Sequence, residues 1–239
     1  MKMKIISIMM KIKKFFFTII IFIPNIIIAQ QDFASWNSVT FNYKIKKTTF
    51  SVSNEFRLNN NSSELDKYLC DFIIEQNLKY GFKIEGAMRY SRFYDLGFQN
   101  EYLYYGVIQY SYRIQRFITE LQTKLQYGVS KYDNLNPDYS EWQWRNKITL
   151  NYLIPGYPIK AYLSYETFIR NKTILEFYKY RFFSGIRYSF NKQNNASVFY
   201  GWQDFTNKIN KTFIVGIKYS LNINKKSKKN KKDYNSDDE

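Results

Sequence analysis

Apolar and polar residues alternate in segment after segment between positions 37 and 223 of the chain. In residues 141–154, Trp142 and Trp144 fall on one side of this pattern, whereas Arg145 falls on the other. Successive side chains of a β-strand point to opposite faces of the sheet. The period of two therefore predicts strands that have one apolar and one polar face.

None of the segments with this pattern has the length of an apolar transmembrane helix, but most have the roughly 9–11 residues with which a tilted strand crosses a bilayer. The predicted strands are Asn37–Ile45, Thr48–Leu58, Tyr68–Tyr80, Phe82–Tyr90, Tyr102–Arg113, Phe117–Tyr132, Glu141–Ile154, Ile159–Arg170, Phe177–Phe190, Ala196–Phe205 and Thr212–Ile223.

The connections between these strands alternate between short and long, as the periplasmic turns and external loops of outer-membrane barrels do. Short connections lie near Lys46, Gly81, Gln115, Gly156 and Gln193, and longer ones near Asn60, Gly97, Asn136, Lys172 and Asn207. With short turns in the periplasm, the ten strands from Thr48 onward begin and end there. The strand at 37–45 then either has an undetected partner or closes the barrel in an unusual way. We therefore expect an all-β, transmembrane, antiparallel up-and-down barrel of 10–12 strands.

The first 29 residues have the features of a secretory signal peptide. Lysines precede an apolar stretch, Phe15–Ile28, and Ala29 provides a small residue at the expected cleavage point. A retained anchor is the competing interpretation, but this stretch is shorter than the roughly 20 residues that a membrane span needs. We expect residues 1–29 to be a signal peptide, residues 30–223 the barrel, and residues 224–239 a disordered charged tail. The expected location is the cell outer membrane.

Composition narrows the chemistry. Aromatic residues make up 20% of the chain, which is too many for a disordered protein, and the formal net charge is +16. For an exported basic protein, phosphates of outer-membrane lipid are closer partners than nucleic acid; a general richness in lysine explains the charge equally well. The single cysteine, Cys70, excludes an intrachain disulfide framework.

The chain contains no histidine, which excludes Ser-His-Asp and Cys-His nucleophilic arrangements and most zinc sites. Paired carboxylates such as Glu141 and Glu166 could act in acid–base catalysis, but charged side chains that fill a barrel are far commoner. We therefore expect no enzyme activity, no catalytic or metal-binding residue and no cofactor.

A soluble lipocalin-like barrel needs an apolar interior, whereas the second face of these strands is heavily charged. The apolar faces are thus expected to contact lipid, with a girdle of aromatic side chains near the strand ends. The expected girdle residues are Tyr68, Tyr80, Trp142, Tyr152, Tyr178 and Phe190.

The polar faces carry charges of both signs and are expected to line the lumen. The expected lumen residues are Glu55, Arg57, Asp71, Glu75, Glu85, Arg89, Glu120, Lys124, Glu141, Arg145, Lys147, Lys160, Glu166, Arg170, Lys179, Arg181, Arg187 and Lys218. One interpretation is a structural barrel or a narrow, porin-like passage for small polar solutes, with a basic bias that favours anions. The alternative is a lumen plugged by ion pairs, in a barrel that binds a surface partner through the loops near Asn60 and Asn136.

The strand that ends the predicted barrel is similar to the terminal-strand signal that outer-membrane barrels present to their insertion machinery. Gly216, Tyr219 and Leu221 have the spacing of that signal, whereas Ile214 and the charged tail depart from it. The barrel-insertion machinery is accordingly an expected partner.

The order of several short stretches resembles the domain-of-unknown-function 2490 family of outer-membrane proteins. These stretches are Asn54–Leu58 running into Ser63–Tyr68, then Arg145–Leu150, Tyr162–Glu166, and the strands that contain Gly185 and Gly216. The resemblance covers nearly all of the chain after the signal peptide. It implies an outer-membrane barrel and supplies neither an established activity nor catalytic residues.

Overall fold

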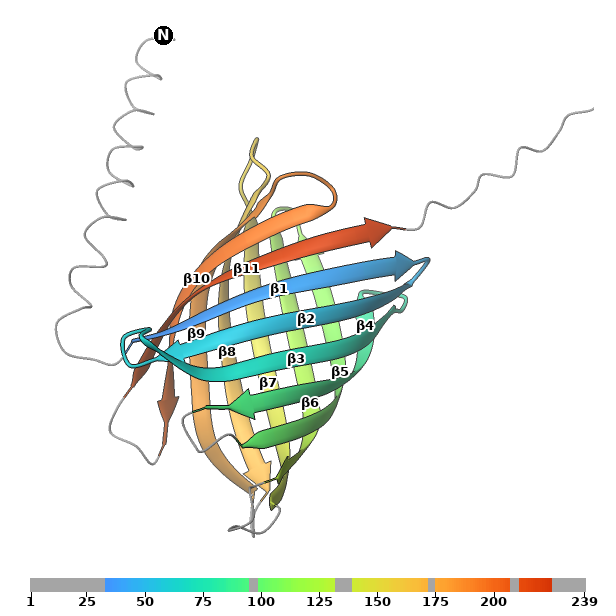
Figure 1. The fold of residues 1–239 in the computed structure, drawn as a ribbon. Helices are drawn as coiled ribbons and strands as arrows, with labels where there is room; N and C mark the ends of the chain where they lie inside the picture. The colour runs from blue at the N-terminus through green and yellow to red at the C-terminus, as the bar shows by residue number, and fades with distance from the viewer. Residues whose placement is uncertain (1–32, 95–98, 132–138, 172–174, 207–210, 225–239) are drawn as a thin grey trace, which may run out of the picture.

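Eleven β-strands make up the computed structural model, which describes residues 33–94, 99–131, 139–171, 175–206 and 211–224 (Figure 1). Within these ranges there is no helix of the length and apolarity that crossing a membrane requires. The strands are β1 (Phe33–Ile45), β2 (Thr48–Asn59), β3 (Glu64–Asn77), β4 (Phe82–Phe93), β5 (Asn100–Ile114), β6 (Phe117–Lys131), β7 (Tyr139–Leu153), β8 (Ile159–Asn171), β9 (Leu175–Ser189), β10 (Asn194–Phe205) and β11 (Thr212–Asn224).

The strands close into one barrel in which sequence neighbours pair antiparallel and β1 pairs with β11 in parallel. This parallel seam extends from Phe33 opposite Phe213 to Lys44 opposite Asn224 (Figure 1). The predicted all-β barrel of 10–12 strands is confirmed, with an odd count of eleven. The first strand closes the barrel itself, because strands that alternate in direction bring β1 and β11 together in the same direction.

The strand bounds confirm the predicted connection lengths only in part. The connection near Gly156, predicted to be short, has five residues, whereas those near Asn60 and Lys172, predicted to be longer, have four and three. At one end of the barrel, Lys46 and Lys47 alone join β1 to β2, and Gln115 and Arg116 alone join β5 to β6. Lys46 and Gln115 adopt left-handed backbone angles, with φ of 54° and 50°, which close these tight hairpins. Phe33 lies at the opposite end, where the three longest connections, β4–β5, β6–β7 and β10–β11, have six, seven and six residues.

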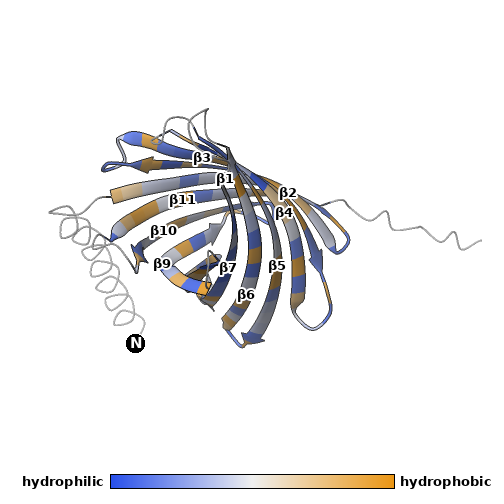
Figure 2. Cartoon of the chain, turned by 90° about the horizontal axis from the view of Figure 1, so that it is seen from below, coloured by the Kyte–Doolittle hydropathy of each residue, from blue (hydrophilic) through white to orange (hydrophobic). Residues whose placement is uncertain are grey.

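The outer face is apolar around the whole barrel, and the polar and apolar positions alternate along each ribbon (Figure 2). Every strand contributes at least one large apolar side chain that is exposed. One such residue per strand, from β1 to β11, is Phe41, Phe50, Phe72, Met88, Tyr104, Leu125, Trp144, Leu163, Ile186, Val198 and Ile217.

Part of the inner face is also apolar, which the alternating pattern did not predict. Ala34, Trp36, Phe199 and Ile214 form a buried cluster at the seam between β1 and β10–β11, and Tyr162 and Phe183 pack against it. Opposite these rings stand glycines: Gly185 faces Tyr162, Gly201 faces Phe183, and Gly216 faces both Phe199 and Trp36. The side-chain-free glycines leave room for the rings.

Some sequence expectations fall outside the described residues. These are the signal peptide at 1–29, the loop centres near Gly97, Asn136, Lys172 and Asn207, and the charged tail apart from Asn224. The strand limits differ from the prediction by up to four residues. The largest differences are in β1, which begins at Phe33 instead of Asn37, and in β3, which spans Glu64–Asn77 instead of Tyr68–Tyr80.

Candidate functional site

The lumen holds a cavity of about 390 Å³ whose wall is rich in cations. Ten lysine and arginine side chains line it, against four glutamates. The cations are Arg57, Lys67, Arg89, Lys124, Arg145, Lys147, Lys179, Arg181, Arg187 and Lys218, and the carboxylates are Glu55, Glu101, Glu120 and Glu166.

The cavity is elongated along the barrel wall. On β6 it is lined by Glu120, Gln122, Lys124 and Gln126, which are four successive inward positions. At about 3.3 Å per residue, six residues of strand correspond to roughly 20 Å. Because barrel strands tilt by about 35–45°, this corresponds to roughly 15 Å along the barrel axis, more than half the height of an apolar band about 25 Å tall.

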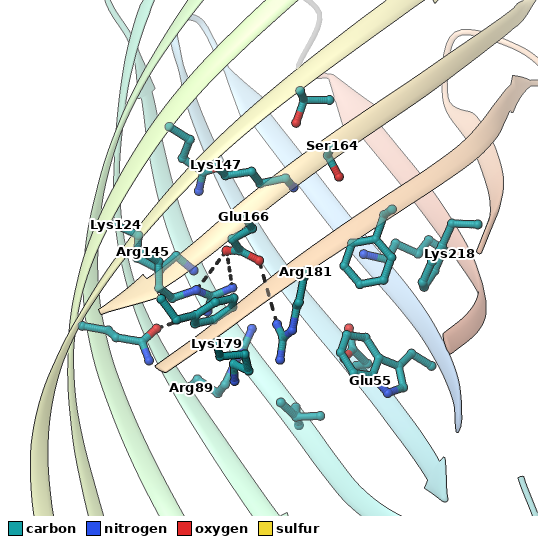
Figure 3. Close-up of a pocket in the computed structure, with 18 of the residues that line it drawn as sticks. Glu55, Arg89, Lys124, Arg145, Lys147, Ser164, Glu166, Lys179, Arg181 and Lys218 are labelled. Carbon is teal, nitrogen blue, oxygen red and sulfur yellow. Dashed lines mark hydrogen bonds and ion pairs between the residues drawn. The ribbon is translucent and has the colours of Figure 1, made fainter. Parts of the chain in front are cut away.

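Ion pairs neutralise only part of this charge. Glu166 on β8 accepts hydrogen bonds from Arg145 at 2.9 and 2.6 Å and lies 3.9 Å from Arg181, so one carboxylate serves two guanidinium groups (Figure 3). Arg89 forms a two-pronged pair with Asp71 at 2.8 and 2.9 Å.

Two further pairs lie closer to the loop end and the seam. Glu55 binds Arg57 at 2.6 Å, and Lys67 lies 3.6 Å from Glu101. Each of these two carboxylates neutralises one cation. The cavity wall stays positive because it carries more lysines and arginines than carboxylates.

Buried aromatic rings hold several cations in place. The ring of Phe168, which is 2% exposed, lies 4.5 Å from the guanidinium of Arg145, 4.6 Å from that of Arg181 and 4.2 Å from the ammonium of Lys179. The face of an aromatic ring attracts a cation by about 0.5–2 kcal/mol. The Phe168 ring therefore holds three long, flexible side chains in place inside the lumen.

Contacts at Trp36 cross part of the lumen. Arg57 from β2 lies 3.9 Å from the Trp36 ring centroid, and Arg181 from β9 lies 4.9 Å from it. Phe183, also on β9, has its ring 5.9 Å from that of Trp36. Since β9 and β1 are separated by β10 and β11, the side chains narrow this side of the lumen.

All but six of the charged residues expected in the lumen line this cavity; the exceptions are Asp71, Glu75, Glu85, Glu141, Lys160 and Arg170. Three of the exceptions form ion pairs: Asp71 with Arg89, Glu75 with Lys83, and Arg170 with Glu176. Among the described residues, one carboxylate oxygen of Glu141 is buried without a hydrogen-bond partner.

The expected girdle residues lie in four different settings, one of which is inside the lumen. Tyr68, Trp142 and Tyr152 each pack a ring against an aromatic residue of the preceding strand, at centroid distances of 5.1, 4.9 and 5.0 Å. Phe190 is exposed just beyond β9, and Tyr80 lies in the turn between β3 and β4 with a positive φ of 57°.

Tyr178 was expected in the lipid-facing girdle, but this expectation is wrong. Its side chain lines the cavity, and the residue is only 9% exposed. The register shifts between Phe168 and Ile169: Phe168 faces Lys179, whereas Ile169 faces Phe177. Tyr178 is thus an extra residue on β9, and such a bulge turns the following alternation to the other face.

Sequence reasoning missed the inward aromatic residues and two charged ones, Lys67 and Glu101. On β5, Leu103, Tyr105 and Val107 point inward while Tyr102 and Tyr104 point outward. Both faces of that strand are apolar or aromatic, so alternation alone did not separate the lumen from the exterior. The described residues include no group of three or more Cys, Asp and Glu side chains that could hold a metal ion.

The sequence profile of the family described as "Protein of unknown function (DUF2490)" matches residues 33–227, which include all eleven strands. The chain belongs to the DUF2490 family. The predicted family resemblance is thereby confirmed. No curated protein matches this DUF2490 chain.

Among solved structures, this DUF2490 barrel is similar to OmpTdeltaL8, a loop L8 deletion mutant of OmpT, an outer membrane protein of Vibrio cholerae. The identity is 13% and the TM-score 0.43, over 74% of this chain and 60% of that chain. It is also similar to outer-membrane expressed OmpT of Vibrio cholerae, at 12% identity and a TM-score of 0.38, over 66% of this chain and 54% of that one. The chain thus spans less than two thirds of the length of these barrels.

Proposed function

We propose that this DUF2490 protein is an outer-membrane barrel that provides a narrow passage for small anionic solutes. The observation that carries the proposal is the excess of cations on the cavity wall, ten against four glutamates. Asp71 pairs with Arg89 and can be counted with the four glutamates. The ten cations then still outnumber the carboxylates by five. Rings of lysine and arginine favour anions in a pore because they lower the electrostatic energy of an anion inside it.

A membrane location is supported by the exterior. Large apolar side chains are exposed on all eleven strands, as at Phe72, Leu125 and Ile186, where about half of each side chain is accessible. A soluble protein rarely exposes a continuous apolar surface of more than a few hundred Å². A closed barrel also leaves no unpaired strand edge, as hydrocarbon requires. Export through a cleaved signal peptide at residues 1–29 belongs to the same proposal.

The second candidate is a plugged barrel that acts by binding a surface partner. The observation that favours it is the set of contacts at Trp36, where Arg57, Arg181 and Phe183 converge from both sides of the seam. Small barrels commonly have interiors filled by side chains. In this case the loop near Asn60 and its counterpart near position 136 would provide the binding surface.

Conductance in planar bilayers tests the passage. We expect purified protein to form small, discrete channels, and a KCl gradient to give a reversal potential of the sign that indicates anion preference. The double substitution Lys147→Gln and Lys218→Gln should shift that potential toward zero, because it removes two positive charges from the cavity wall. Lys79→Gln, in the exposed turn between β3 and β4, is the matched control and should leave the potential unchanged.

A complete absence of channels from correctly folded protein contradicts the passage and favours the plugged barrel. Cation preference contradicts the anionic substrate class while leaving the membrane barrel intact.

A further inference from the structure

A row of directly opposed inward positions runs across four neighbouring strands of the barrel. Lys124 on β6 faces Arg145 on β7, Arg145 faces Phe168 on β8, and Phe168 faces Lys179 on β9. In Figure 3 the side chains of Lys124, Arg145 and Lys179 enter the same part of the cavity, beside Glu166 and Arg181. Three cations and one ring therefore share a single level of the lumen.

Like charges at directly opposed positions destabilise a pair of strands. The Lys124–Arg145 pair has such an arrangement, and Lys124 is only 9% exposed. The charges of Arg145, Lys179 and Arg181 all lie within 4.6 Å of the Phe168 ring centroid, so any two of them are at most twice that distance apart. The fold thus concentrates positive charge at this level.

The carboxylates of the protein do not balance this cluster. Glu166 pairs with Arg145 and Arg181, but within the described part of the chain neither Lys124 nor Lys179 forms an ion pair. Glu85 on β4 belongs to the same row of opposed positions as Lys124 and is separated from it by Val107 on β5. With Glu85 counted beside Glu166, the four cations leave an excess of two positive charges.

A buried charge without a counter-ion raises the free energy of the folded protein. If the chain provides no counter-ion, one must bind from solution. Guanidinium groups offer a planar fork of donors that matches oxyanions, whereas ammonium groups act as compact point charges. Two of each, converging on a cavity of about 390 Å³, match a small oxyanion with several charges and several acceptor oxygens better than a halide.

We propose that Lys124, Arg145, Lys179 and Arg181 form a binding site for a phosphate-type oxyanion, either inorganic phosphate or a small soluble phosphate monoester. The site rests on the proposed anion passage and gives it a substrate class. Phe168 organises the site by holding three of the cations around one ring, and Glu166 orients both guanidinium groups. The barrel wall shields this level of the lumen from lipid headgroups.

Isothermal titration of the folded, detergent-solubilised protein with inorganic phosphate tests the site. We expect saturable binding, with glycerol phosphate as the monoester arm also binding, and no detectable heat from chloride at equal ionic strength. Succinate, titrated in parallel, separates phosphate from carboxylate recognition. Tighter binding of succinate than of phosphate overturns the phosphate assignment.

Lys124→Gln and Lys179→Gln should each weaken phosphate binding by about tenfold to a hundredfold, because each removes a charge-assisted contact. Lys44→Gln is the matched control: it makes the same change at an exposed position near the end of β1, outside the cavity. It should bind phosphate as the unmodified protein does. Equal binding by all three variants overturns the site. Heat-dependent gel migration verifies that each variant is folded, and phosphate block of the unmodified channel provides a readout that needs no variant.

The outcomes separate the two proposals. Anion-selective conductance without phosphate binding leaves the passage standing and removes the site. Saturable phosphate binding without conductance retains the site as a closed binding cavity and removes the passage.

Discussion

Single glycines determine how the aromatic side of the lumen packs. A methyl group added at Gly216 would lie 2.1 Å from the Trp36 carbonyl oxygen and 2.2 Å from a ring carbon of Phe199. At Gly86, on the outer face of β4, the same methyl group would meet no atom within 4 Å. Glycine is thus required at position 216 because the Trp36 backbone and the Phe199 ring occupy the space that a side chain would need, whereas position 86 carries no such restriction.

Substituting alanine at these two positions tests this difference. We expect Gly216→Ala to lower the unfolding free energy by about 1–3 kcal/mol, the usual cost of overpacking. Gly86→Ala should be neutral or slightly stabilising, because alanine reduces the backbone freedom of the unfolded strand. Unfolding in urea, followed by tryptophan fluorescence of protein in vesicles, measures both. Equal stability of the two variants would contradict the close approach of the Trp36 backbone and the Phe199 ring to Gly216.

Among the strands, β1 and β11 decide how the barrel closes. Their parallel pairing covers twelve positions and brings Val39 opposite Tyr219. Parallel pairs are slightly less stable per residue than antiparallel ones. Here the seam is reinforced on its inner side by Trp36, which is paired with Gly216 in the ladder and whose ring contacts that of Phe183 of β9.

A disulfide across the seam tests its direction and register. In a Cys70→Ser background, Val39→Cys combined with Tyr219→Cys should oxidise readily, because both side chains are on the outer face of adjacent strands. The control pair, Val39→Cys with Val215→Cys, is offset by four residues, or about 13 Å, and should not form a bond that needs Cα atoms within about 7 Å. Altered migration of the denatured, non-reduced chain reports the bond. Cross-linking of the control pair instead would contradict this register.

At the scale of the whole molecule, the barrel has an apolar exterior and a cationic interior. Leu125 lies near the middle of β6 with about half of its side chain exposed, whereas Tyr157 lies in the turn between β7 and β8 and is exposed to a similar degree. In water both side chains would contact solvent to a similar degree. In a bilayer, Leu125 would contact hydrocarbon and Tyr157 the interface.

Arginine substitutions at these positions therefore test the proposed membrane location. Leu125→Arg should lower the unfolding free energy in vesicles by about 2–4 kcal/mol, the cost of arginine at the bilayer midplane, and Tyr157→Arg by about 0–1 kcal/mol. Reversible unfolding in the presence of vesicles measures both. If the two variants have the same stability, or if the unmodified protein stays monodisperse in buffer without detergent, the exterior does not face lipid.

The sequence by itself determined the strands, the turns and the identity of most of the charged lumen residues. Alternation between Trp142, Trp144 and Ile148 on one side and Arg145 and Lys147 on the other is a local property, because each strand side chain points opposite to the previous one. The turns at Lys46 and Gln115 are likewise determined by the local sequence. For this reason all but six of the charged residues expected in the lumen line the cavity.

Only the tertiary structure decided how distant strands meet. The parallel pairing of β1 with β11 joins residues about 180 positions apart, as Asn42 and Asn222 show with a side-chain hydrogen bond of 2.9 Å. The bulge that turns Tyr178 inward and the convergence of Lys124, Lys179 and Glu166 likewise depend on register between strands. A period of two specifies which face a residue occupies, but not which residue of another strand stands beside it.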